Sequence, residues 1–156
     1  MDMDNGKTSF VYVTYIRTTA EKVYEAISQP EVARRYWGHE NISDWKPGSD
    51  WRHVRADGQR SVNVVGKVVE AVPPTRLVIT WASPSRADDP AAYSRVTFEI
   101  TPYDGMVRLT VSHDELEAGG TMAKGIRQGW PIVLSSLKSL LETGEGIDVF
   151  AKPSGG

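Results

Sequence analysis

The amino-acid sequence predicts an α+β fold, in which a curved antiparallel sheet of six or seven strands wraps around a long C-terminal helix. Apolar residues alternate with period two through residues 41–113, as in strands with one buried face. Asp-Gly pairs at Asp57 and Asp104 separate these runs, which is typical of hairpins. Residues 129–145 carry an apolar stripe with helical spacing. Because hairpins join neighbouring antiparallel strands, the helices are expected on one side of the sheet.

The first part of the chain predicts one strand and two short helices. Residues 10–16 are rich in β-branched and aromatic residues and predict a strand. Thr18 can cap the helix that follows, with Glu21 at the capping-box position. Pro30 suits the first turn of a second helix.

The middle of the chain predicts the remaining strands of the sheet. A short extended segment begins near residue 41, and alternating runs follow at residues 50–55, 61–72, 76–81, 94–100 and 106–113. The residues expected to share the inner face of the last four runs are Val62, Val64, Val68 and Val72, then Leu77, Ile79 and Trp81, then Val96, Phe98 and Ile100, and finally Val107, Leu109, Val111 and His113.

The last helical region carries the apolar stripe of Trp130, Val133, Leu134, Leu137 and Leu141. Pro131 lies inside it and predicts an interrupted helix, since proline removes a backbone donor. Residues 122–129 then form either a lid hinged near Gly129 or a separate segment. Leu134 and Leu137 are expected to face a pocket, and Leu141 is expected in solid packing near the helix end.

Composition limits the function classes. The chain has 156 residues, enough for one domain, which we place at residues 10–145 between flexible segments 1–9 and 146–156. A net charge of -2 gives no electrostatic support for binding nucleic acid. The absence of cysteine excludes disulfides and thiolate chemistry. The sequence shows no signal peptide and no apolar run of membrane-spanning length, so a cytoplasmic location is expected.

Four stretches give the chain a family resemblance. They are "VTYIRTTAEKVYEAISQPEVARRYW", "GKVVEAVPPTRLVITW", "RVTFEITPYDGMVRLTVSH" and "GWPIVLSSLKSLLETGE". Together they resemble the helix-grip fold of the START-like (SRPBCC) superfamily and, more narrowly, the bacterial single-domain homologues of the heat-shock-protein ATPase activator. The resemblance implies a cavity between the sheet and the long helix that binds apolar or amphipathic molecules, lipid-like or polyketide-like, without a cofactor.

The residues expected to line this cavity are aromatic, imidazole and aliphatic side chains: Trp51, His53, Trp81, His113, Trp130, Leu134 and Leu137. Aromatic walls with a few polar groups are common in small-molecule sites, but the same residues can also be core filler. His53 and His113 could share a metal with Glu40, Asp114 or Glu115, yet no metal-binding spacing is present, so no metal is expected.

Three functions follow from this reading. Binding of a small molecule in the cavity is preferred, and no catalytic motif is present. The alternative is a cyclase or hydratase type of enzyme with general acid and base groups among His53, His113, Tyr93 and Arg55. A chaperone-associated interaction protein is the third possibility. The sequence does not define the oligomeric state.

Overall fold

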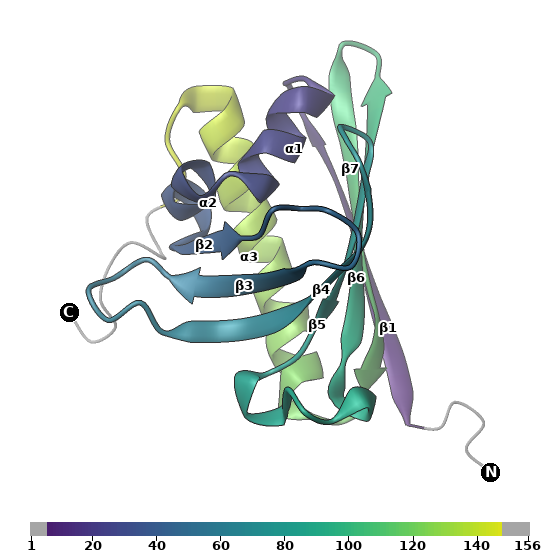
Figure 1. The fold of residues 1–156 in the computed structure, drawn as a ribbon. Helices are drawn as coiled ribbons and strands as arrows, with labels where there is room; N and C mark the ends of the chain where they lie inside the picture. The colour runs from purple at the N-terminus through teal and green to yellow at the C-terminus, as the bar shows by residue number, and fades with distance from the viewer. Residues whose placement is uncertain (1–5, 148–156) are drawn as a thin grey trace.

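The computed structural model describes residues 6–147 and has the α+β helix-grip architecture (Figure 1). Seven strands form one antiparallel sheet in the order β1-β7-β6-β5-β4-β3-β2. The elements are β1 (Lys7–Ile16), α1 (Ala20–Ser28), α2 (Pro30–Trp37), β2 (His39–Ile42), β3 (Asp50–Arg55), β4 (Val62–Val72), β5 (Arg76–Trp81), the short 3-10 helices η1 (Pro84–Arg86) and η2 (Pro90–Ala92), β6 (Ser94–Tyr103), β7 (Met106–Glu117) and α3 (Thr121–Thr143). In Figure 1, α3 runs along the inside of the curved sheet, with α1 and α2 beside its C-terminal end.

The period-two pattern sets most of the inner face of the sheet, although Val62 is only partly buried. The inward residues expected in β5, β6 and β7 are all buried. In β4, Val64 and Val68 are buried, but Val72 is 46% exposed, so its expected inward position is wrong. The register of β4 against β5 shifts between Val68 and Glu70, and this irregularity reverses which face the later residues of β4 present.

Local signals place the first helices with small corrections. The N-cap of α1 is Thr19, whose Oγ1 accepts a hydrogen bond from the backbone of Lys22 at 3.3 Å, and not Thr18 as expected. Pro30 begins α2 as predicted, and Gly38 ends it with a positive φ of 68°. β2 then begins at His39, two residues before the extended segment that the sequence predicts near residue 41.

The long helix is continuous, so the predicted interruption at Pro131 is wrong. Pro131 has no N–H to donate to the carbonyl of Arg127, but α3 extends on both sides of it. Buried side chains before and after the proline, such as Ile126 and Val133, belong to the same hydrophobic core. Their packing outweighs the loss of one helical hydrogen bond.

The ends of the described chain are tied to the fold. β1 begins at Lys7, and the backbone N–H of Ala118 donates to the carbonyl of Gly6. At the other end, the N–H of Ile147 donates to Ser136 Oγ at 2.9 Å. The outer parts of the segments expected to be flexible, residues 1–5 and 148–156, lie outside the described residues. No helix within residues 6–147 is both long and apolar enough to cross a membrane.

Candidate functional site

Five of the seven predicted pocket residues form one cluster inside the fold, with Trp81 of β5 at its centre. The ring centroid of Trp81 lies 5.5 Å from that of Trp51, 5.8 Å from His53, 5.3 Å from His113 and 5.7 Å from Trp130. These residues come from three strands and from α3. All five are buried, so the structure brings them together as a closed layer of rings between sheet and helix. We call these five residues the aromatic cluster.

The two predicted leucines extend this layer along α3. Leu134 and Leu137 are both buried and belong to the same hydrophobic core as the cluster. Leu141 is only partly buried, packed against the edge of that core. The expected solid packing of Leu141 is therefore wrong, whereas the expected position of Leu137 at a pocket stays a prediction. The end of α3 is closer to the surface than its middle.

A second group of residues, which the sequence did not single out, contacts the His53 ring and bonds its Nδ1. Trp37 of α2 lies edge-on to His53 at 4.6 Å. Asn41 donates from Nδ2 to the carbonyl of Ile27 at 2.9 Å, so its Oδ1 accepts the proton of His53 Nδ1 at 2.7 Å. His39 stacks on His53 at 4.3 Å with nearly parallel rings. Burial, together with the nearby His39, lowers the pKa of His53 well below its ordinary value of 6.5.

A directed chain of hydrogen bonds joins α3 to three strands. The indole Nε1–H of Trp130 donates to His113 Nδ1 at 3.1 Å. His113 therefore carries its proton on Nε2, which donates to Ser94 Oγ at 2.7 Å. The hydroxyl of Ser94 donates in turn to the carbonyl of Trp81 at 3.1 Å. Burial lowers the pKa of His113 to about 3, so the ring is neutral at neutral pH.

These three hydrogen bonds determine what His113 can do chemically. Its Nδ1 lone pair is occupied by Trp130, and its Nε2 already bears a proton, so it has no free lone pair to act as a base toward Ser94. Of the other groups of the enzyme alternative, His53 lies in the same cluster, whereas Tyr93 and Arg55 are bonded outside it. The hydroxyl of Tyr93 donates to the carbonyl of Ala87, and Arg55 pairs with Asp57 at 2.9 Å. His113 therefore links α3 to β5 through hydrogen bonds and not through a free basic nitrogen.

One donor inside the cluster has no partner. Trp81 is only 6% exposed, and its indole Nε1 is buried without a hydrogen-bond partner among the described residues. The neighbouring Trp51, by contrast, donates from Nε1 to the carbonyl of Thr80 at 2.7 Å. A buried N–H group without an acceptor is rare in folded proteins. The interior of the cluster therefore offers a free hydrogen-bond donor.

Gly66 of β4 makes the position of Trp51 possible. The indole of Trp51 reaches across β4 to bond Thr80 of β5. A Cβ at Gly66 would lie 1.9 Å from the carbonyl oxygen of Thr80 and 2.6 Å from Trp51 Nε1. Only glycine leaves room for this contact. A glycine inside a strand is the sequence signal that could have indicated the close approach.

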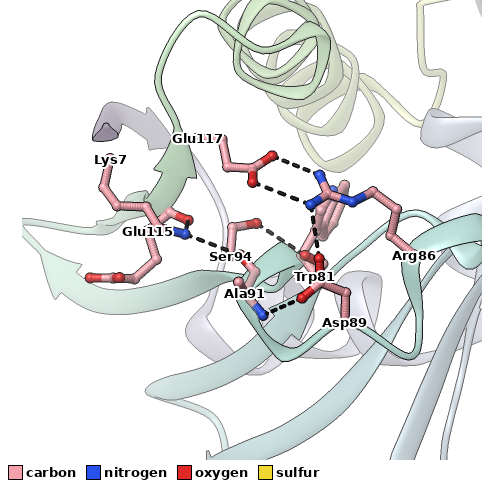
Figure 2. A network of polar contacts seen from close by, with 8 residues as sticks. All are labelled: Lys7, Trp81, Arg86, Asp89, Ala91, Ser94, Glu115 and Glu117. Carbon is pink, nitrogen blue, oxygen red and sulfur yellow. Dashed lines mark hydrogen bonds and ion pairs between the residues drawn. The ribbon is translucent and has the colours of Figure 1, made fainter. Parts of the chain in front are cut away.

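A surface pocket of about 270 Å³ reaches the hydrogen-bond chain at Ser94. Its wall includes Thr121 and Met122 of the first turn of α3 and residues of the β5–β6 loop. Figure 2 shows Arg86 of this loop facing Glu117. The Arg86 guanidinium lies 2.7 Å from a Glu117 carboxylate oxygen and 3.0 Å from an Asp89 carboxylate oxygen. These ion pairs hold the loop against the end of β7.

Strand β7 has a bulge at this pocket. The register of β1 against β7 shifts opposite residues 8–10, and Glu115 of β7 has a positive φ of 61°. Lys7 donates from Nζ to the carbonyls of Ala91 and Glu115, as drawn in Figure 2. Because of this bulge, Leu116 points inward after His113, although the simple alternation would place Glu115 there.

A metal site is not formed by the acidic and imidazole groups considered from the sequence. Within residues 6–147, no three His, Cys, Asp or Glu side chains are grouped so that they could hold a metal ion. Glu40 instead pairs with Arg34 at 2.9 Å and with Arg60 at 2.7 Å. The hydrogen bond from Arg60 is the main cause of the lowered pKa of Glu40.

The fold is shared with several solved structures. The solution structure of an Aha1 dimer from Colwellia psychrerythraea aligns with a TM-score of 0.73 at 18% identity, over 89% of this chain and 99% of that one. A protein from Cytophaga hutchinsonii aligns with a TM-score of 0.69 at 26% identity, over 86% and 93%. An HSP90 activator from Plasmodium falciparum aligns with a TM-score of 0.65 at 20% identity, over 78% and 86%. No curated protein sequence matches the chain.

The sequence also matches a known family over most of its length. Residues 17–142 match the family described as activator of Hsp90 ATPase homolog 1-like protein. This range begins just before α1 and ends inside the last turn of α3, so it contains the whole aromatic cluster. The chain therefore belongs to the activator of Hsp90 ATPase homolog 1-like family.

Proposed function

We propose that the chain binds a small apolar or amphipathic molecule, lipid-like or polyketide-like, between the inner face of the sheet and α3. The observation that carries this proposal is the unpaired indole N–H of Trp81 at the centre of the aromatic cluster. An unsatisfied buried donor costs about 1–3 kcal/mol, and a carbonyl, ether or hydroxyl oxygen of a ligand would relieve that cost. The surrounding rings supply the apolar contact area.

Residues 121–129, the first half of α3, are the part of the proposed binding site that we expect to move. Gly125 and Gly129 lie in this half, and a Cβ at either position would meet no atom within 4 Å. Each glycine weakens a helix by about 1 kcal/mol relative to alanine. Pro131 removes one more backbone hydrogen bond at the end of this segment. We infer that a ligand enters at the pocket beside Ser94 when residues 121–129 move away from the sheet.

The proposal is tested with 11-(dansylamino)undecanoic acid, a fluorescent lipid-like probe, and with native mass spectrometry of the purified protein. Wild type is expected to bind the probe and to retain a small molecule through purification. Trp81→Phe keeps most of the ring surface but removes the N–H, and one hydrogen bond corresponds to about 2–10-fold in affinity. Trp45→Phe is the matched control, because its indole bonds Ser28 outside the cluster.

Two results would contradict the proposal. Failure of wild type to bind the probe, with no molecule retained through purification, removes the binding function. Equal affinity of Trp81→Phe and Trp45→Phe shows that the free donor takes no part in recognition.

A second function is favoured by the family itself. Its description names the activation of an Hsp90 ATPase, and the solved relative from Plasmodium falciparum is an HSP90 activator. We propose contact with a chaperone as the alternative role of this chain. The test is the ATPase rate of purified Hsp90 with and without the chain, with bovine serum albumin as the control protein. An unchanged rate, together with no complex in analytical ultracentrifugation, would contradict it.

A further inference from the structure

A surface groove runs along the exposed side of α1, away from the aromatic cluster. It consists of two adjoining hollows of about 510 and 490 Å³, which share Glu21 and Pro74 in their walls. The first hollow lies against the middle of α1 and reaches Trp45 in the β2–β3 loop. The second lies between the start of α1 and the β6–β7 turn. Figure 1 shows α1 next to the tip of the β6–β7 hairpin. We call the two hollows together the α1 groove.

The charged residues that line the α1 groove are all acidic. They are Glu21, Glu25, Asp44 and Asp104, and no lysine or arginine is among the lining residues. Within residues 6–147, none of these four carboxylates takes part in an ion pair. Glu21 and Glu25 lie one turn apart on α1, both exposed, and like charges at this spacing repel each other. A cationic partner would remove this repulsion.

The floor of the groove is apolar and rigid. Pro73, Pro74 and Pro102 contribute to it, and the ring of Tyr103 is half exposed. Trp45 is held at a positive φ of 60°, with its indole Nε1 donating to the carbonyl of Ser28 at 2.9 Å. Grooves walled by aromatic side chains bind extended segments, because the rings offer flat surfaces at low entropic cost.

We propose that the α1 groove docks an extended segment of a partner protein that carries lysine or arginine side chains between apolar ones. The four carboxylates would pair with the cations, and the proline and aromatic floor would cover the apolar side chains. The negative charge of the groove excludes nucleic acid and anionic membrane surfaces, which it repels. This proposal is independent of the ligand in the interior, since the two sites share no residue.

The test begins with a phage-displayed library of random 12-residue peptides, selected on the wild-type protein. The enriched peptides are expected to carry at least two lysine or arginine residues separated by apolar ones. One such peptide, labelled with fluorescein, is then titrated with Glu21→Gln/Glu25→Gln. Exposed ion pairs are weak, so the loss of two is expected to reduce affinity about 3–10-fold at low salt and less at high salt.

The matched control is Glu31→Gln/Glu145→Gln, which removes the same charge at two exposed positions outside the groove. It is expected to bind the peptide like wild type, and thermal melts verify that both variants fold. Peptides without basic residues, or equal affinity of the two double variants, would overturn the proposal. Competition by spermine at the affinity of the peptide would also overturn it, because the groove would then recognise a small cation and not a protein segment.

Discussion

Lowering the pH from 7 to 5 is expected to destabilise this protein through its two buried histidines. Burial lowers the pKa of His113 from 6.5 to about 3, and burial with the nearby His39 lowers the pKa of His53 in the same direction. In the unfolded chain both rings are solvated and titrate near pH 6.5. As the pH falls below that value, the unfolded state takes up protons that the folded state does not, so folding becomes less favourable.

The size of this effect follows from the two pKa values of His113. With an unfolded pKa of 6.5 and a folded pKa of about 3, linkage gives a loss of about 2 kcal/mol between pH 7 and pH 5. The lowered pKa of His53 adds to this loss in the same direction. The loss is a substantial share of the roughly 5–15 kcal/mol by which a domain is stable. The carboxylates with lowered pKa, such as Glu40, act mainly below about pH 4.5.

The assay is urea unfolding followed by tryptophan fluorescence at half-unit steps of pH. Wild type is expected to lose at least about 2 kcal/mol of unfolding free energy between pH 7 and pH 5. His113→Gln is expected to be less stable at pH 7, but to lose about 2 kcal/mol less than wild type over the same range, because one titrating ring is gone. A change of less than about 1 kcal/mol in wild type would refute the reasoning, since the histidines would then be solvated in the folded state.

Three further predictions concern packing and helix stability, and stability changes are measured by chemical denaturation. Gly125→Ala/Gly129→Ala is expected to stabilise the fold by about 2 kcal/mol, because both sites have room for a Cβ, and to slow binding of the dansyl probe; unchanged stability and kinetics would contradict this. Gly66→Ala is expected to abolish the native near-ultraviolet circular dichroism, because its Cβ would lie 1.9 Å from a backbone oxygen; a native spectrum would show that the close approach is wrong. Leu137→Ala is expected to cost about 2–5 kcal/mol and Leu141→Ala less, since only Leu137 is fully buried; the reverse order would argue against the packing.

Much of the fold could be predicted because its signals are local and repeated. The alternation in β5, β6 and β7 identified the inner face, since each strand pairs without a register shift along those inward residues. Val72 was misplaced because a shift in β4 depends on pairing with β5, which one strand's sequence does not show. Pro131 was misjudged for a similar reason. The tertiary packing of α3 against the sheet outweighs the local cost of proline, and only the folded structure reveals that balance.

The site was predicted less completely than the fold. Trp81 and His113 could be found because they share strand phase with apolar residues, and Trp130 because it lies on the apolar stripe of the last helix. Ser94 has the same phase as Val96, and a polar residue at an inward position is a signal of a buried hydrogen bond. Asn41 gives no comparable signal, because its role depends on meeting both Ile27 and His53 in space.

The position of Trp130 connects the stability of α3 with the proposed binding site. Trp130 lies between the half of α3 that contains the two glycines and the half that contains Leu134 and Leu137. Its bond to His113 continues through Ser94 to β5, so it fixes the helix to the sheet at this boundary. On the entry route that we propose, the N-terminal half would move while this bond holds the C-terminal half in place. A molecule entering beside Ser94 would meet a fixed wall on the sheet, where Trp81 offers its free donor, and a movable wall on the helix.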